Sequence, residues 1–272
     1  MPELPEVETV LRGIQPHIEQ QTIKKVVIRH YGLRWPIPHN ITVILKNKKI
    51  ETVERRAKYL LLRTITGTAI IHLGMSGSLR VLTDVISPQK HDHVDIIFSN
   101  NKILRFTDPR RFGAFLWTND DPMLHPLLKH LGPEPLSNDF SVQYLWKQVQ
   151  NRSLSIKLFI MDSKIVAGVG NIYANEALFQ AGIYPAMPTK LITLQQCQQL
   201  VRAIKQILRQ AIRQGGTTLK DFVDSEGRPG YFTQRLKVYG RAEEACMHCT
   251  TRLQTMIIGQ RSTVYCRRCQ SG

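Results

Sequence analysis

The chain has no apolar run of the roughly 20 residues that a membrane-spanning helix needs. Its first residues are acidic rather than basic, which does not fit a secretory signal peptide. Because both features are absent, the sequence predicts a cytoplasmic protein with no membrane partner.

Acidic residues are scarce. The 21 Asp and Glu are outnumbered by 37 Lys and Arg, which leaves a formal net charge of +16 and a sequence pI near 9.9. Such an excess of positive charge favours a polyanionic partner such as nucleic acid. Charge alone does not name that partner.

Cysteine is also rare, with five in 272 residues. Cys197 lies on the apolar face of a helical pattern, where we interpret it as a core residue. The other four form two CxxC pairs separated by sixteen residues: Cys246, Cys249, Cys266 and Cys269. This spacing predicts one Zn²⁺ with four thiolate ligands and no open position, and therefore a structural metal, whereas two disulfides are the alternative. Arginines within this module, Arg261 among them, fit either phosphate contacts or a solvated surface.

The chain divides into a β-rich half and a helical half. Apolar residues recur at helical spacing from Glu6 to Ile18, and short β-rich runs follow between about residues 22 and 118, which indicates a β-sandwich or barrel. Gly and Pro concentrate at 131–138, where we place a linker. Beyond it the pattern predicts helices over 155–161, 172–180 and 194–212, the last ended by Gly215 and Gly216.

The N-terminus offers a candidate nucleophile. Removal of Met1 would leave Pro2 as a free secondary amine, and α-amines have a pKa of roughly 7.7 to 8.0, so a neutral fraction exists at physiological pH. Attack by this amine on a sugar C1′ gives an iminium, an electron sink for eliminating the attached phosphates. Glu3 lies beside it as a candidate proton shuttle. Taken alone, however, a Pro-Glu start is more often a helix cap.

Eight motifs, taken in order, carry a resemblance that spans the chain. They are PELPEVETV at the start, RRAKYLL at 55–61, HLGMSGSLR at 72–80, KHDHVD at 90–95, TDPRRFGA at 107–114, AGVGNIYANEALF at 167–179, QGGTTLKDF at 214–222 and the terminal CxxC pairs. Together they closely resemble the bacterial formamidopyrimidine-DNA glycosylase family.

The resemblance implies an α+β fold. It consists of an N-terminal catalytic β-sandwich flanked by helices (1–132), a linker region (133–150), a helix-two-turn-helix domain with a lesion loop (151–235) and a zinc ribbon (236–272), with DNA between the halves. The implied activity is that of a monomeric glycosylase and AP lyase of base excision repair. It removes oxidised purines such as 8-oxoguanine and formamidopyrimidines from double-stranded DNA and nicks the strand by β,δ-elimination.

The resemblance also assigns catalytic roles to four residues. Pro2 carries the Schiff base, Glu3 is the acid at the sugar, and Lys58 assists β-elimination. Arg261 grips the phosphates that flank the lesion and is linked to the second elimination.

Further residues match the family's DNA contacts. Met75, Arg110 and Phe112 fill the gap left by the flipped base, with Arg110 hydrogen-bonded to the orphaned cytosine, which offsets the cost of unstacking. Four more contact phosphates: His91, Arg152, Lys157 and Asn171. Arg152 departs from the lysine-rich run that is commoner at this place. The stretch 217–231 resembles the loop that closes over the base.

Two alternatives stay open. An endonuclease VIII type of enzyme shares the Pro2–Glu3 chemistry but prefers oxidised pyrimidines, and its members usually begin PEGPE rather than PELPEVE. A catalytically silent zinc-ribbon protein would bind nucleic acid through charge alone. The presence of Pro2, Glu3 and Lys58 together disfavours the silent binder.

Overall fold

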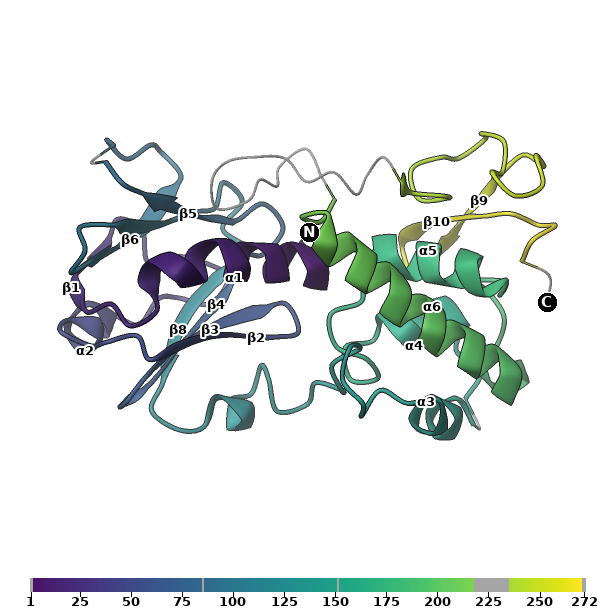
Figure 1. Ribbon diagram of the computed structural model, residues 1–272, viewed down its shortest axis with the longest axis horizontal. Coiled ribbons are helices and arrows are strands. Elements are labelled where there is room, and N and C mark those ends of the chain that lie inside the picture. The colour runs from purple at the N-terminus through teal and green to yellow at the C-terminus, as the bar shows by residue number, and fades with distance from the viewer. Residues whose placement is uncertain (1, 85, 151, 218–234, 271–272) are drawn as a thin grey trace. The chain divides into compact units, whose positions relative to one another are not determined.

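The computed structural model describes residues 2–84, 86–150, 152–217 and 235–270 (Figure 1). The chain forms two compact units. The first comprises residues 1–130 with 214–231, and the second comprises residues 131–213 with 232–272.

The first unit is a sandwich of two antiparallel four-stranded sheets. One has the order β1-β6-β7-β5 and the other β2-β3-β4-β8. The strands of the first sheet are β1 (Ile23–Ile28), β6 (Asp92–Phe98), β7 (Ile103–Thr107) and β5 (Ser78–Leu82). Those of the second are β2 (Thr52–Arg56), β3 (Tyr59–Thr64), β4 (Gly67–His72) and β8 (Ala114–Thr118). The predicted β-sandwich is therefore confirmed, and the barrel is not observed.

Helix α1 (Leu4–Ile18) packs its apolar face into the core of this unit. Val7, Val10 and Ile14 are at most 1% exposed, as their three- and four-residue spacing requires. Pro5 stands in the first turn, where a missing N–H costs nothing. The helix therefore starts directly after Glu3 and fixes the N-terminus against the sandwich. The unit also contains the short helix α2 (Ile41–Leu45) and the 3₁₀ turn η1 (Pro122–Leu124).

The second unit is helical with a terminal hairpin. Its helices are α3 (Val142–Val149), α4 (Ile156–Met161), α5 (Asn171–Ala181) and α6 (Leu194–Arg213), with a 3₁₀ turn η2 (Thr189–Leu191). The hairpin pairs β9 (Gln254–Ile258) with β10 (Arg261–Tyr265). Every residue from 172 to 179 is buried, so α5 is the central helix of the unit.

Two details bear on the sequence interpretation. The stretch 133–150, interpreted as a linker region, contains α3, because Ser141 caps the helix through the N–H of Tyr144 while Leu145 and Val149 are buried. Cys197 is fully buried on the apolar face of α6, as its place in the helical pattern indicates. Among the residues that the structure describes, no helix is long and apolar enough to cross a membrane.

Candidate active site and DNA-contacting loops

Pro2 and Glu3 are buried where α1 begins. A second acid, Glu6, holds this segment: its Oε2 accepts the N–H of Glu3 at 2.8 Å. Its Oε1 accepts both the N–H and the hydroxyl of Thr217, each at 2.9 Å. Gly216 lets this approach occur, since it has φ 78° and a Cβ there would lie 3.0 Å from Glu6 Oε1. One buried carboxylate therefore ties the candidate catalytic dipeptide to residue 217.

Lys58 lies in the tight turn between β2 and β3, where Arg56 pairs with Tyr59. Ala57 adopts a positive φ of 53° in this turn. Arg55 donates to Glu8 of α1 at 2.8 Å and to the carbonyl of Ala57 at 3.0 Å. Burial alone would raise the pKa of Glu8, but the hydrogen bonds and positive charges of Arg55 and Arg12 together outweigh it and the pKa is lowered. The Lys58 turn is thus tied to the helix that begins at the N-terminal dipeptide.

His72 ends β4 and connects the Lys58 side of the site with the segment that carries Met75. Its Nδ1 accepts the N–H of Gly74 at 3.0 Å, and its ring packs on Tyr59 with centroids 4.8 Å apart. Burial first, and then the positive charges of Lys58 and Arg34, lower the pKa of His72 to about 4. The imidazole is therefore neutral at physiological pH and keeps Nδ1 free to accept.

The segments that carry Met75 and Phe112 touch. Gly74 has φ 65°, and a Cβ there would lie 2.5 Å from the backbone carbon of Phe112, so only glycine allows this approach. Phe112 is 41% exposed, and the guanidinium of Arg110 lies 4.9 Å from the centroid of its ring. The structure therefore brings together the three residues predicted to fill the gap behind a flipped base.

His91 borders a polar pocket of about 540 Å³. The lining includes the cationic or imidazole side chains of Arg29, His30, Lys90 and Arg111. Such a set of donors suits a phosphate group.

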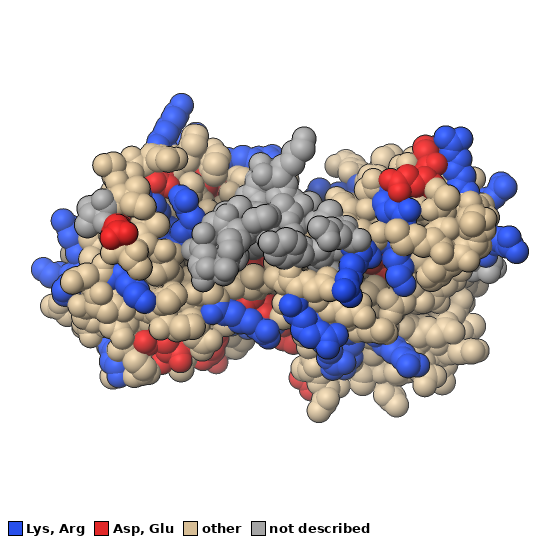
Figure 2. Space-filling view, turned by 45° about the horizontal axis from the view of Figure 1, so that its top comes forward, with Lys and Arg blue, Asp and Glu red and all other residues tan. Residues whose placement is uncertain are grey.

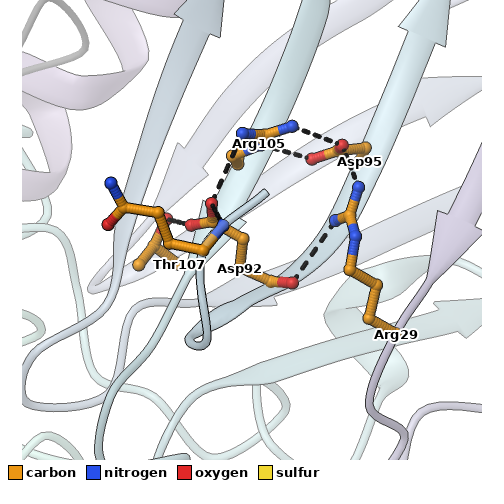
Figure 3. Close-up of polar contacts among 6 residues, drawn as sticks. Arg29, Asp92, Asp95, Arg105 and Thr107 are labelled. Carbon is orange, nitrogen blue, oxygen red and sulfur yellow. Dashed lines mark hydrogen bonds and ion pairs between the residues drawn. The ribbon is translucent and has the colours of Figure 1, made fainter. Parts of the chain in front are cut away.

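A buried ion network lies next to this pocket (Figure 3). Arg105 donates two hydrogen bonds of 2.8 Å to Asp95 and contacts Asp92 at 3.3 Å, while Arg29 adds a bond to Asp95. Burial alone would raise the pKa of Asp95, but the hydrogen bonds from Arg105 and Arg29 hold it below its usual value. Asp92 also accepts from Thr107, which fixes the start of β6 beside His91.

In the second unit, Arg261 starts β10 directly after a two-residue turn. Gly259 and Gln260 both have positive φ, 56° and 59°, as the favoured hairpin turns require. The turn packs tightly, since a Cβ on Gly259 would lie 2.4 Å from Leu158 of α4.

Three side chains clamp the strand behind Arg261. Lys157, which is fully buried, donates to the carbonyl of Ser262 at 3.0 Å and to the hydroxyl of Thr263 at 2.7 Å. Asn171 donates to the same Ser262 carbonyl at 3.1 Å, and Asn175 accepts the N–H of Val264 at 2.9 Å. Lys157 and Asn171 thus contact the ribbon, and their contacts with DNA stay predictions. Arg152 is exposed, with its guanidinium 5.6 Å from the Phe159 ring.

The four ribbon cysteines form one metal site. Their sulfur atoms lie within 4.8 Å of one another. Two of the Sγ–Sγ distances are 3.9 Å, from Cys246 to Cys269, and 3.4 Å, from Cys249 to Cys266. Tetrahedral Zn–S bonds of about 2.3 Å separate ligand sulfurs by about 3.8 Å, whereas a disulfide would hold them at about 2.0 Å. The residues therefore fit one structural Zn²⁺ with four protein ligands, and the disulfide alternative is wrong.

The predicted residues fall into two groups. Pro2, Glu3, Lys58, Met75, His91, Arg110 and Phe112 lie in the first unit, and Arg152, Lys157, Asn171, Arg261 and the zinc ligands in the second. Of the predicted loop 217–231, residues 218–231 lie outside the described residues.

Sequence reasoning missed three polar residues that hold the first group: Glu6, His72 and Asp108. For Glu6 a signal exists, because an acid three residues after a helix cap indicates a capping box. His72 and Asp108 stand in the motifs at 72–80 and 107–114, but the motifs alone did not indicate their contacts with Tyr59 and Ser76, which come from other parts of the sandwich.

A β-sandwich that buries a Pro-Glu helix start, with a helical unit that ends in a four-cysteine ribbon, defines a zinc-containing DNA glycosylase of the helix-two-turn-helix type. Family models match each part: the formamidopyrimidine-DNA glycosylase N-terminal domain over residues 1–115, its H2TH domain over 131–223, and a zinc finger found in FPG and IleRS over 243–272. The chain belongs to the formamidopyrimidine-DNA glycosylase family.

Relatives match over the whole length. The formamidopyrimidine-DNA glycosylase of Saccharophagus degradans is 54% identical over 99% of this chain and 100% of the relative, and that of Escherichia coli is 53% identical over the same shares. The crystal structure of the Fpg protein from Thermus thermophilus has a TM-score of 0.88 at 34% identity, covering 99% of this chain and 98% of that one. A complex of Lactococcus lactis Fpg with abasic-site DNA reaches 0.91 at 31% identity, covering 99% and 100%.

Proposed function

We propose that this chain is a bifunctional DNA glycosylase and AP lyase that removes oxidised purines, among them 8-oxoguanine and formamidopyrimidines, from double-stranded DNA. The observation that carries the proposal is the buried Pro2–Glu3 start, held by Glu6 and tied to the Lys58 turn through α1. A mutant of the Lactococcus lactis relative has been crystallised with DNA that contains Fapy-dG, and that relative itself with abasic-site DNA. We further propose that it acts as a monomer in the cytoplasm, associated with the nucleoid through DNA.

The chemistry begins at the amine of Pro2 once Met1 has been removed. The nitrogen forms a bond to the sugar C1′ as the base leaves with the electron pair of the glycosidic bond, and the proton of the amine passes to the departing base. Glu3 gives a proton to the ring oxygen as the sugar opens, and the product is an iminium at C1′. Because a secondary amine gives a cationic iminium without further protonation, this iminium already serves as the electron sink for elimination.

Strand cleavage follows from this iminium. Removal of a proton from C2′ expels the 3′ phosphate, and Lys58 assists this β-elimination. Arg261 grips the flanking phosphates and assists loss of the 5′ phosphate in the second elimination. Throughout, the zinc site keeps the hairpin that carries Arg261 folded and takes no part in the reaction.

A second substrate class has a specific observation behind it. One Lactococcus lactis Fpg structure is a complex with oxidised-pyrimidine DNA. The two substrate classes are separated by initial cleavage rates on matched duplexes, one with 8-oxoguanine and one with thymine glycol, each opposite its normal partner. We expect 8-oxoguanine to be cleaved faster, and faster cleavage of thymine glycol would overturn the purine assignment. Binding with no cleavage of either duplex by Met1-free protein would favour the silent binder.

A further inference from the structure

Asp108 is a fully buried carboxylate in the first unit, directly after Thr107 at the end of β7. Among the described residues, it makes no ion pair with a Lys or Arg. A buried carboxylate is costly unless its oxygens accept hydrogen bonds, and here both do. Oδ1 accepts the hydroxyl of Ser76 at 3.0 Å, and Oδ2 accepts the N–H of Gly113 at 2.8 Å.

Those two donors stand beside the residues predicted to fill the opened duplex. Ser76 follows Met75, and Gly113 follows Phe112. The Asp108 backbone adds three contacts: its N–H donates to the carbonyl of His91 at 3.0 Å, and its carbonyl accepts from His93 Nε2 at 2.8 Å and from the N–H of Arg111 at 3.2 Å. One residue therefore joins the segments that carry Met75, His91 and the Arg110–Phe112 pair.

Close packing makes this joint rigid. A Cβ on Gly113 would lie 2.7 Å from the carbonyl oxygen of His72 and 3.0 Å from Asp108 Oδ2, and one on Gly77 would lie 2.2 Å from the carbonyl oxygen of Leu73. Arg111 adopts a positive φ of 57°, which turns the chain between Arg110 and Phe112. The Phe112 segment is therefore packed directly against His72 and the Asp108 carboxylate, with no space between the backbones for a larger residue at position 113.

We propose that Asp108 is a positioning residue that couples the Met75 segment to the Arg110–Phe112 segment, so that the three side chains enter the duplex as one unit. The inference rests on the proposed function, because it concerns the residues that fill the gap behind a flipped base. Asp108 itself touches neither DNA nor the reacting atoms in this account. Its loss therefore affects opening of the duplex more than the chemistry at Pro2.

The test compares two substrates that undergo the same strand cleavage. They differ in whether an opposite strand is present and leaves a gap that the three side chains must fill. A duplex with one abasic site opposite cytosine requires the gap to be filled, whereas a single-stranded oligonucleotide with the same abasic site has no opposite strand. Ser76→Ala removes only one of the two bonds. We expect it to lower the ratio of duplex to single-strand cleavage rates about tenfold, the size expected for one hydrogen bond to a charged acceptor.

Matched variants separate coupling from general damage. Ser78→Ala removes a hydroxyl two residues away, on β5, and should keep the wild-type ratio. Asp108→Asn should keep most of the ratio, because its amide oxygen can accept from Gly113 while its NH₂ donates to Ser76. In Asp108→Ala, the ratio of duplex to single-strand cleavage rates should fall at least as far as in Ser76→Ala.

Three results overturn the inference. The first is a Ser76→Ala variant that keeps the wild-type ratio of duplex to single-strand cleavage rates. The second is a Ser76→Ala variant in which both cleavage rates fall equally. The third is an Asp108→Asn ratio as low as that of Asp108→Ala. If instead the wild-type protein cleaved neither substrate, the proposed function would fail, and this inference with it.

Discussion

At the scale of single residues, the first unit depends on buried carboxylates whose partners are backbone N–H groups and two hydroxyls. Glu6 accepts from Glu3 and Thr217, and Asp108 from Ser76 and Gly113, all by hydrogen bonds of 2.8 to 3.0 Å. Backbone donors have fixed directions, so such bonds position a segment more narrowly than exposed ion pairs, which contribute little. The residues proposed for the chemistry and for filling the duplex are thus held by acids to which we assign no chemical step.

His72 makes the stability of the first unit depend on pH. Its pKa is near 6.5 when unfolded and about 4 in the folded protein, so unfolding takes up a proton between these values. The contribution of His72 to the free energy of unfolding is fully present above pH 6.5. It is lost as the pH falls toward 4, by about 3 kcal/mol in total. Urea unfolding of the first unit at a series of pH values from 7 to 4 measures it.

The matched variant is His72→Gln, whose amide oxygen can still accept the N–H of Gly74 but does not titrate. Its free energy of unfolding should fall less than that of the wild type over the same range, because all other titrating groups are shared. Parallel curves for the two proteins would refute the buried, neutral imidazole.

At the scale of elements, glycines decide how closely two segments approach. Gly74→Ala places a Cβ 2.5 Å from the Phe112 backbone at a φ of 65°. Gly240→Ala has a similar φ of 77° but no atom within 4 Å. We expect Gly240→Ala to cost only the strain of the left-handed backbone, about 1 kcal/mol. Gly74→Ala should cost more and slow 8-oxoguanine excision at least tenfold, as thermal unfolding and single-turnover kinetics will show. Equal effects of the two substitutions would contradict the packing.

Helix α5 supports the zinc ribbon from inside the second unit. Asn171 and Asn175 bind β10, Glu176 accepts the N–H groups of residues 237, 238 and 239 at 2.8 to 2.9 Å, and Phe179 packs in the cluster that contains Cys246 and Cys266. The ribbon is thus attached through backbone contacts that exist only when it is folded.

Loss of a zinc ligand should therefore weaken DNA binding without unfolding the whole chain. Cys249→Ala is expected to bind less than one zinc per chain and to lose at least tenfold in affinity for abasic-site DNA, because the hairpin with Arg261 loses its fold. Cys197→Ala, at the buried cysteine in α6, is the control and should keep one zinc and its affinity. Metal analysis and fluorescence anisotropy measure both, and unchanged affinity in a zinc-free Cys249→Ala protein would contradict the account.

The sequence predicted those elements whose pattern is local, and it did not predict contacts between residues far apart in the chain. Periodicity located α1, α5 and α6, and the CxxC spacing located the zinc site, because each pattern is local. It passed over α3, which lies beside a Gly- and Pro-rich stretch. The motifs gave Pro2, Lys58 and Arg261, but only the fold shows that Asp108 meets Ser76 across two strands. Those pairings depend on sheet register, which no local pattern determines.

At the scale of the whole molecule, the excess of positive charge governs association. Lys and Arg side chains are spread over the face shown in Figure 2, with fewer Asp and Glu among them. A net charge of +16 attracts DNA of any sequence, so charge supplies affinity while the sites described above supply the chemistry.

Affinity for undamaged duplex should therefore fall linearly with salt on a double-logarithmic plot. Each phosphate contact contributes about 0.9 to the slope. Because Arg111 lines the pocket beside His91, Arg111→Gln should reduce the slope by about one contact. Lys24→Gln changes the same charge on β1, outside the pocket, and should leave the slope nearly unchanged. Anisotropy titrations at several salt concentrations test this, and equal slopes for the two variants would refute a phosphate in the pocket.

Covalent trapping tests most directly whether the amine of Pro2 attacks the sugar. Borohydride reduction during reaction with 8-oxoguanine duplex should join the Met1-free protein to DNA through a stable amine, visible as a shifted band and as peptide mass at residue 2. Pro2→Gly, or protein that retains Met1, should trap at least a hundredfold less while still binding abasic-site DNA. Wild-type trapping by protein that retains Met1 would contradict the account.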